Sequence, residues 1–471
     1  MEISRNTNKL QKTSKEDYSE ETRLETGGNR RVHSASSASS NLKAKSKKGT
    51  VKLLERILHK RNLHEAYKRV KKNKGSHGVD GMEVEELLPY LKENVDSLTR
   101  EILEGKYEPK PVRRVEIPKD NGKMRLLGIP TVIDRLIQQA IAQELNKIVD
   151  GDFSENSYGF RPGRSAHMAL RESKRFINGG KKYVVDMDLE RFFDTVHHDK
   201  LMGLLAKKID DKRVLKLIRA YLNSGIMING VKVKSEEGAP QGGPLSPLLS
   251  NILLDELDKE LEKRGHQFCR YADDCNIYVK SKRAGKRVLE SITKFLEKNL
   301  KLKVNQEKSA VASPIRRKFL GYSYYYTKDG IQLRVHQKSF TKLKDKIRKV
   351  TNRNASMNFE WRLKKLAQIT TGWVNYYKLA NMERKLREID EWIRRRLRCC
   401  IWKTWKEVKT KGKNLMKLGV PKSKAWEYAN TRKSYWRISN SPILKKTITN
   451  QRLINHGFKS LSKQYKKIRL S

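Results

Sequence analysis

The sequence is poor in acidic residues and has no long apolar run. Its 471 residues contain 53 Asp and Glu against 104 Lys and Arg, which leaves a formal net charge of +51. Positive charge on this scale opposes compaction unless a polyanion covers it, so nucleic acid is the first candidate partner. An anionic membrane surface is the alternative, but no segment is apolar enough to cross a bilayer and no signal-like stretch opens the chain. We therefore expect a cytoplasmic protein without a membrane partner.

Cysteine is scarce as well. The four cysteines are Cys269, Cys275, Cys399 and Cys400, none of which belongs to a CxxC pair. This spacing disfavours both a disulfide framework and a zinc site. We expect all four to be reduced packing residues.

The character of the sequence changes along the chain. Residues 1–50 are rich in Ser, Asn and Lys without apolar periodicity, which is typical of a disordered basic leader. Helical spacing begins near residue 53, and residues 107–130 are extended, with "PKDNGK" as a hairpin-turn signal. "YVVDMDL" at 183–189 predicts a buried strand. After about residue 336 the pattern predicts long helices dense in Lys, Arg and Trp.

Apolar residues at helical spacing predict several helices. "TVIDRLIQQAIAQELNKIV" indicates an amphipathic helix, and "SPLLSNILLDELDKELEKR" indicates another, with Ser246 as its N-cap and Pro247 at its first position. The apolar stripe of the latter comprises Leu249, Leu253, Leu257 and Leu261. A later stripe comprises Met382, Leu386, Ile389, Ile393 and Leu397. Each stripe is expected to face a core.

Two adjacent acids stand in an otherwise apolar, strand-like stretch, "CRYADDCNIY" at 269–278. Asp273 and Asp274 repel each other and are costly to bury unless something neutralises them. With a third acid from a neighbouring strand they would form a platform for Mg²⁺, and a pair of such ions supports phosphoryl transfer. In "VVDMDLERFFD" a period of two puts Asp186 and Asp188 on one strand face, and Asp194 is a further candidate. The residues alone leave this choice open.

A family resemblance extends from about residue 53 to the C-terminus. "RLLGIPTVIDRLIQQAI", "SYGFRPGRSAHMAL", "DMDLERFFDTVHHDKL", "GAPQGGPLSPLLSNILLDELD", "YADD" and "FLGY" resemble the motifs of group II intron reverse transcriptases (maturases). The resemblance implies an α+β fold, a right-hand polymerase whose fingers and antiparallel palm sheet occupy 107–335 after an N-terminal extension at 51–106. An α-helical thumb/maturase domain at 336–410 and a basic DNA-binding region at 411–471 would follow. The C-terminal segment lacks the paired cysteines of an HNH nuclease, so none is expected.

The same resemblance selects among the acids. In the family the first metal-binding Asp precedes a bulky aromatic residue by five positions, as Asp188 precedes Phe193. It implies that Asp188 and Asp273 are the principal ligands of two Mg²⁺ ions. Asp274 and the backbone carbonyl of Leu189 would assist them. Asp186 is interpreted as structural.

The resemblance also implies a nucleotide pocket. Lys119 and Arg125 would reach the incoming triphosphate, Phe193 would lie under its sugar and exclude a 2′-hydroxyl, and Gln241 would touch the nascent base pair. Without the motifs, the two cations would be interpreted as solvated charges beside a turn and Phe193 as a core aromatic. The adjacent Phe192 is interpreted as core.

"YGFRPGRSAH" places Arg161 and Arg164 around a Pro-Gly turn, where they would grip the template backbone. The expected protein is an RNA-directed DNA polymerase that binds its intron RNA, assists splicing and performs target-primed reverse transcription. Its partners would be intron RNA, an RNA template with a DNA primer, target DNA and dNTP, in a bacterial cytoplasm or on the nucleoid. A splicing-only maturase and a reverse transcriptase of an antiviral or diversity-generating system are the alternatives.

Overall fold

The computed structural model describes residues 52–118, 122, 124–228, 231–233, 237–238 and 242–470. These residues divide into two compact units. The first contains residues 52–338 together with Leu379–Asn381, and the second contains 339–378 and 382–470. The expected leader, 1–50, lies outside the described residues.

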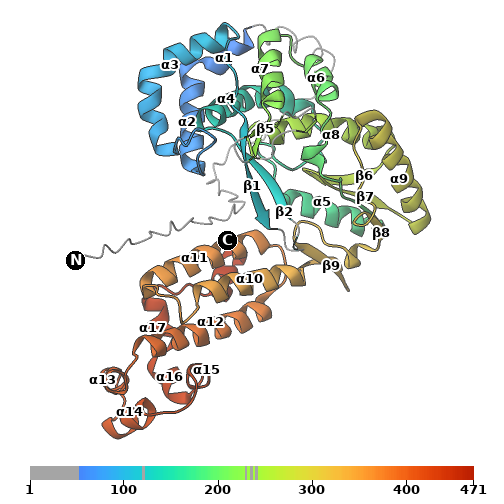
Figure 1. Cartoon of the computed structure of the whole chain (residues 1–471). Helices are drawn as coiled ribbons and strands as arrows, with labels where there is room; N and C mark the ends of the chain where they lie inside the picture. Colours follow the sequence, from blue (N-terminus) through green and yellow to red (C-terminus); the bar gives the residue numbers. More distant parts are fainter. Residues whose placement is uncertain are drawn as a thin grey trace, which may run out of the picture. The chain divides into compact units, whose positions relative to one another are not determined.

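The first unit begins with packed helices. They are α1 (Leu53–Leu58), α2 (Lys60–Asn73), α3 (Leu87–Leu103) and α4 (Val132–Val149) (Figure 1). The segment expected to be an amphipathic helix is α4, but it is buried on almost all sides because α1 and α2 both pack against it. Its polar side chains find partners inside. Arg56 of α1 lies 2.7 Å from the Glu144 carboxylate, and Gln143 Nε2 donates to Asn62 Oδ1 of α2 at 2.6 Å.

A four-stranded sheet in the order β2-β1-β4-β5 follows. Its strands are β1 (Val112–Pro118), β2 (Met124–Ile129), β4 (Ile226–Ile228) and β5 (Val231–Val233). The register of the β1–β2 hairpin runs to Pro118 opposite Met124, which confirms the hairpin expected at "PKDNGK". Strand β4 joins β1 in parallel, so a segment more than a hundred residues away completes the sheet. Helices α6 (His198–Ala206) and α7 (Lys212–Asn223) precede β4.

A second sheet, in the order β6-β7-β3-β8, is antiparallel throughout, as expected for the palm. Its strands are β3 (Tyr183–Met187), β6 (Gln267–Tyr271), β7 (Asp274–Val279) and β8 (Ala310–Ala312). Helices α8 (Ser246–Lys263) and α9 (Lys282–Phe295) bury one face of it; Figure 1 shows α9 beside the sheet. That face supplies Val185, Phe268 and Ile277 to the main core.

Helix α8 carries the expected stripe, since Leu249, Leu253, Leu257 and Leu261 are all buried. Its expected N-cap was wrong by one position. Leu245 is the cap, Ser246 is the first helical residue and Pro247 follows it. The shift has a local cause, because Leu245 already has near-helical dihedrals (φ −82°, ψ −31°).

The opposite face of the palm sheet is only partly covered. Helix α5 (Ala166–Asn178) packs beside β6, and the hairpin β9 (Tyr322–Thr327) and β10 (Gly330–Val335) lies beyond it. Tyr278 donates a 2.5 Å hydrogen bond to Ser173 of α5, which also bonds Tyr324 of β9. The covered part of this face therefore contains a chain of hydrogen-bonded hydroxyl groups. The other end of the same face carries the acids described below.

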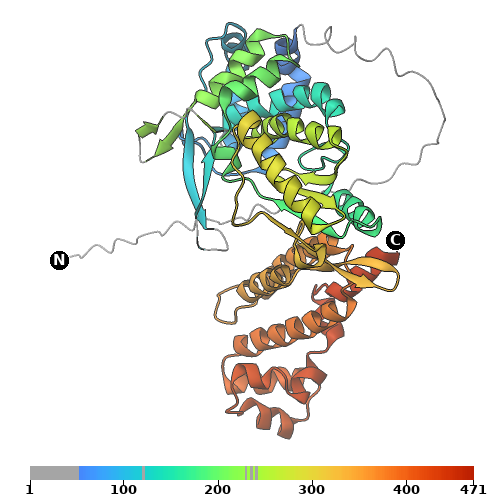
Figure 2. The ribbon, with the colours of Figure 1, turned by 90° about the vertical axis from the view of Figure 1, so that its right-hand side faces the viewer.

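The second unit is helical in every described residue that has regular structure, and Figure 2 shows it coloured orange to red. Its long helices are α10 (Gln337–Val350), α11 (Phe359–Tyr377) and α12 (Glu383–Thr404). Shorter helices follow: α13 (Val408–Lys417), α14 (Lys422–Ala429), α15 (Tyr435–Ile438), α16 (Pro442–Thr447), α17 (Asn450–Asn455) and α18 (Leu461–Leu470). The stripe expected on α12 is confirmed, because Met382, Leu386, Ile389, Ile393 and Leu397 are all buried.

The four cysteines are free and buried, which confirms their expected packing role. Cys269 and Cys275 lie on the palm strands β6 and β7, while Cys399 and Cys400 lie on α12. Among the helices that the structure describes, none combines the length and apolarity needed to traverse a bilayer.

Candidate active site

The two adjacent acids lie at the tip of the β6–β7 hairpin. Tyr271 pairs with Asp274, so Ala272 and Asp273 form a two-residue turn. Ala272 has φ +57°, a left-handed conformation that a residue with a Cβ rarely adopts. The turn thus projects Asp273 and Asp274 from the end of the palm sheet and holds one residue in a strained conformation.

Asp188 reaches the same place from β3. The β3–β7 pairing ends with Met187 opposite Cys275, and one further step brings Asp188 opposite Asp274. Alternation across the pleat then puts Asp186, Asp188 and Asp274 on one face, opposite the face that α8 and α9 cover. The backbone at Asp188 is held by Asn305, whose N–H donates to the Asp188 carbonyl at 2.8 Å.

The acids interact electrostatically. Desolvation by the surrounding protein, followed by the charges of Asp273, Asp186 and Asp188, raises the pKa of Asp274 to about 7. The Asp274 residue is exposed on one side, so the effect reflects crowding by protein atoms and other acids rather than full burial. Desolvation also raises the pKa of Asp273, and the charge of Asp188 adds to it. Three sequence-predicted acids therefore converge, from segments that are distant in sequence.

Basic side chains balance part of this charge. The Lys308 ammonium lies 2.7 Å from Asp188 Oδ2, and Arg317 binds the Asp186 carboxylate at 2.5 Å. The charges of Arg125 and Lys308 both oppose the rise in the pKa of Asp273. Arg125 lies on β2, so the other sheet of this unit supplies a cation to the acids.

Sequence reasoning missed Lys308 and Arg317. Each is a single basic residue among many, in segments with no motif of their own. The only available signal was their position shortly before "FLGY", in the segment that follows the acids. The Arg317 ion pair agrees with the interpretation of Asp186 as a structural residue.

The chemistry of this cluster fits a divalent cation. Carboxylate oxygens are the ligands that Mg²⁺ prefers. A cation would stabilise the ionised forms of Asp273 and Asp274, whose pKa values are raised by desolvation and by the neighbouring acids. The acids are not gathered into a finished site, because the described residues contain no group of three or more His, Cys, Asp or Glu side chains positioned to hold one ion. Lys308 and Arg317 occupy two of the carboxylates instead.

Phe193 follows β3 in the short helix η4 (Phe192–Asp194). Phe192 is 3% exposed, which confirms it as core, and its ring packs edge-on against the half-buried Phe193 ring at 5.2 Å. Gly238 packs against the Phe193 backbone, where an added Cβ would come within 3.0 Å of the Phe193 carbonyl. Phe192 therefore packs against the ring of Phe193 and Gly238 against its backbone, while the half-buried ring keeps part of its surface accessible.

Two expected pocket residues, Lys119 and Gln241, lie outside the described residues. The glycines after Gln241 do approach neighbouring groups closely. A Cβ at Gly242 would come within 2.5 Å of the Gly128 carbonyl oxygen, and one at Gly243 would collide with the Gln138 side chain. The glycines therefore let this loop run against β2 and α4.

The two arginines of "YGFRPGR" have different surroundings. Arg161 is buried; its guanidinium donates to Asp150 Oδ1 at 2.8 Å and to the Ser154 and Ser157 carbonyls at 2.6 and 3.0 Å. These contacts disagree with the expectation that Arg161 grips a template, because its donors are already used within its own loop. Arg164 is half-buried and pairs with Glu155, whose side chain is exposed.

Comparisons with known proteins bear on both units of the chain. The model of the family "Reverse transcriptase (RNA-dependent DNA polymerase)" matches residues 117–324, and that of "Group II intron, maturase-specific domain" matches residues 340–419. Protein YkfC of Escherichia coli K12 is 36% identical over 300 residues, which cover 55% of this chain and 79% of that protein.

The group II intron-encoded protein LtrA of Lactococcus lactis subsp. cremoris is 32% identical over 331 residues, which cover 56% of this chain and 55% of LtrA. The match thus spans about half the length of LtrA. Among solved structures, a chain of a Cas6-RT-Cas1–Cas2 complex is 26% identical with a TM-score of 0.35, over 52% of this chain and 42% of that chain.

Proposed function

The chain belongs to the group II intron reverse transcriptase/maturase family, whose polymerase domain is an RNA-directed DNA polymerase, and we propose that Asp188, Asp273 and Asp274 form the polymerase site of this member. One observation carries the proposal: β3 and the β6–β7 turn bring these acids together at the uncovered end of the palm sheet. A structural role alone gives no reason to gather acids where desolvation and their mutual repulsion raise the pKa of Asp274 to about 7.

Two Mg²⁺ ions would complete the site, held by the three carboxylates and the Leu189 carbonyl. When bound, such ions activate the primer 3′-oxygen and stabilise the leaving pyrophosphate. The chain's own residues prepare the site. The β-bridge between Leu189 and Val304 fixes the backbone beside Asp188, and Lys308 neutralises its carboxylate until a cation replaces the ammonium.

The nucleotide would lie between the acids and the β1–β2 hairpin. The charge of Arg125 lowers the pKa of Asp273, and we propose that its guanidinium binds the triphosphate beside the acids. We propose Lys119 as a second phosphate contact and Gln241 as a contact to the nascent base pair. Phe193, braced by Phe192 and Gly238, would exclude the ribose 2′-hydroxyl.

Intron RNA binding and splicing assistance belong to the second unit in this proposal, because the maturase-specific match covers residues 340–419. Exposed basic side chains there would meet phosphates, while the large aromatics have mainly packing roles. Trp402 is 2% exposed, and the Arg395 guanidinium stacks 3.9 Å from the Trp436 ring centroid. Target DNA would bind further toward the C-terminus, and Arg164 remains a proposed template contact.

The test is primer extension on an RNA template with a DNA primer, dNTP and Mg²⁺. The wild-type protein should extend the primer, and Asp273→Asn should lower the rate by roughly a thousandfold or more because a ligand oxygen and its charge are lost. Asp152→Asn is the matched control, since it removes an exposed carboxylate that pairs with Lys208 in the same unit. Its rate should equal that of the wild type.

The outcomes separate the alternatives. If the wild type extends nothing while it still promotes splicing of a bound intron RNA, the protein is a splicing-only maturase. If it extends primers but no intron RNA co-purifies with it, the antiviral or diversity-generating class is favoured. If Asp273→Asn extends as fast as the wild type, the proposed site is wrong.

A further inference from the structure

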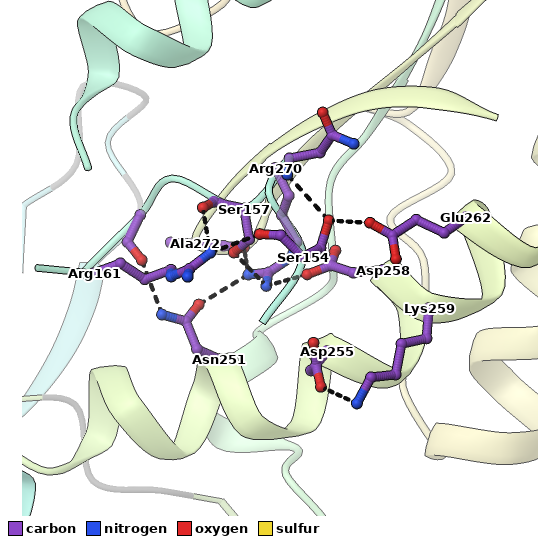
Figure 3. Close-up of polar contacts among 12 residues, drawn as sticks. Ser154, Ser157, Arg161, Asn251, Asp255, Asp258, Lys259, Glu262, Arg270 and Ala272 are labelled. Atoms are coloured by element: carbon purple, nitrogen blue, oxygen red, sulfur yellow. Dashed lines mark hydrogen bonds and ion pairs between the residues drawn. The ribbon is translucent and has the colours of Figure 1, made fainter. Parts of the chain in front are cut away.

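A buried ionic network lies beneath the turn that carries Asp273. Arg270 lies on β6, two residues before Ala272 of the turn, and it is fully buried. Its guanidinium faces away from the acids. Figure 3 shows it among Ser157, Asn251, Asp258 and Ala272. Register explains the direction: Arg270 pairs with Cys275, which lies on the face covered by α8.

Every N–H of this guanidinium has an acceptor. Nε donates to Asp258 Oδ1 at 2.7 Å, and Nη2 donates to Asp258 Oδ2 at 2.5 Å and to Ser157 Oγ at 2.7 Å. Nη1 donates to Asn251 Oδ1 at 2.9 Å and to the Ala272 carbonyl at 3.0 Å. An arginine has five such donors, and all of them are used here.

The last of these contacts reaches the turn itself. The Ala272 carbonyl belongs to the peptide bond that joins Ala272 to Asp273, and Ala272 has the left-handed φ of +57°. A left-handed conformation at a non-glycine residue persists only where its surroundings impose it. The contact from Nη1 is one such constraint.

Gly159 supplies the other constraint. A Cβ at Gly159 would lie 2.9 Å from the Tyr271 carbonyl carbon and would collide with the Ala272 nitrogen, so the loop lies directly against the turn. Asn251 links the two constraints, because its Nδ2 donates to the Gly159 carbonyl at 2.8 Å while its Oδ1 accepts from Arg270. The turn is therefore held by the 154–164 loop, α8 and β6 at once.

We propose that Arg270 is a positioning residue for polymerisation: neutralised by Asp258 and oriented by Asn251, it holds the Ala272 carbonyl and thereby fixes the turn that presents Asp273. This inference rests on the proposed function, in which Asp273 is a ligand. It assigns a role to a residue that touches neither substrate nor cation. Arg270 acts through the backbone, and Asp258 and Asn251 act through Arg270.

The decisive variant is Arg270→Lys. Lysine keeps the charge that Asp258 needs but has only three donors on a single nitrogen, so it cannot hold Asp258, Asn251 and the Ala272 carbonyl together. Amide hydrogen exchange in the segment 271–275 should be about tenfold faster than in the wild type. In primer extension kcat should fall by about tenfold or more, while KM for dNTP stays within about twofold, because the nucleotide contacts are unchanged.

A second substitution tests whether Arg270 acts by holding Ala272 in its left-handed conformation. Glycine adopts a positive φ without strain, so Ala272→Gly removes the conformational penalty that the Arg270 contact offsets. Arg270→Lys combined with Ala272→Gly should therefore recover at least about threefold in kcat over Arg270→Lys alone. If Arg270→Lys does not fold, Asn251→Ala takes its place, with a smaller loss of the same pattern and the same recovery.

Arg362→Lys is the matched control. Arg362 is also buried, and it also holds backbone carbonyls, those of Asn352 and Ala355, but in the second unit. It should leave exchange at 271–275 unchanged. The proposal is overturned if Arg270→Lys leaves exchange and kcat at wild-type values, or if Ala272→Gly gives no recovery. Inactive wild-type protein would instead count against the proposed function.

Discussion

The Lys308 ammonium lies 2.7 Å from Asp188 Oδ2, although 120 residues separate the two in sequence. Arg317 reinforces this arrangement, since it binds the Asp186 carboxylate and also donates to the Lys308 carbonyl at 2.7 Å. The segment after β7 and α9 thus returns to the acids and places a cation where a metal ion would bind. Two of the acids at the proposed polymerase site, Asp186 and Asp188, are therefore paired with basic side chains before any ion binds.

Removal of this cation should strengthen binding of Mg²⁺. In Lys308→Met the metal no longer competes with an ammonium for Asp188, so thermal stabilisation by Mg²⁺ at pH 8 should be half-complete at roughly threefold lower concentration. The effect is modest because the Lys308 side chain is 60% exposed and screened by solvent. Lys294→Met is the control, since it removes an exposed lysine paired with Glu290 on α9. An unchanged or higher midpoint for Lys308→Met would contradict the competition.

The uncovered side of Phe193 should set sugar selectivity. Phe193→Val makes room for a 2′-hydroxyl, so the ratio of ribonucleotide to deoxyribonucleotide incorporation should rise by about tenfold or more. Single-nucleotide extension with each substrate measures this ratio. Phe295→Val shortens another partly buried ring packed on the same core and should leave the ratio unchanged. Equal ratios for Phe193→Val and the wild type would remove Phe193 from the pocket.

The raised pKa of Asp274 predicts how stability depends on pH without metal. Its pKa rises from 3.8 unfolded to about 7 folded, so the folded protein holds an extra proton between these values. The contribution of Asp274 to the free energy of unfolding is then largest below about pH 4 and is lost as pH rises toward about 7. Asp274→Asn should remove this component.

Urea unfolding in EDTA at several pH values measures the difference between wild type and Asp274→Asn. The variant should gain stability relative to the wild type as pH rises through the window. Added Mg²⁺ should shrink this gain, because the cation favours the ionised wild-type carboxylate. A difference that does not vary with pH would show that the Asp274 carboxyl is not perturbed.

The two acids of β3 should behave differently on substitution. Asp186→Asn breaks a partly buried ion pair with Arg317 and should cost about 1 kcal/mol of stability or less, with primer extension reduced by no more than about tenfold. Asp188→Asn should lower extension by roughly a thousandfold or more with little change in stability. Denaturation and primer extension on both variants decide the matter. The reverse ranking of the two rates would exchange their roles.

Local patterns in the sequence predicted much of the fold. The leucine stripe of α8, the apolar stripe of α12 and the buried strand at 183–189 all reflect periodicities that follow from helix and strand geometry. Where a prediction was wrong in detail, tertiary packing was the reason. Helix α4 was expected to have a polar face, but α1 and α2 cover that face and supply partners for its polar side chains.

Site residues also divide into those that local sequence indicates and those that depend on tertiary packing. Adjacent acids in an apolar strand are conspicuous, so Asp273 and Asp274 were candidates from the sequence, and the family resemblance supplied their proposed role. Asp186 and Asp188 share a strand face, and the period of two could not distinguish them. Each pairs with its own basic residue, Asp186 with Arg317 and Asp188 with Lys308, and their separate roles stay a prediction. Arg161 and Arg164 looked equivalent around one turn, yet burial commits the former to its own loop.

The sequence by itself therefore determined the elements, the acids and the family, because each depends on residues close together along the chain. Only the tertiary structure decided which cations meet those acids and that Arg270 lies beneath the turn of Asp273. With 104 Lys and Arg, no single basic residue is distinguished by composition or spacing. Its role depends on which distant segment folds against it, and that is set by the packing of the whole unit.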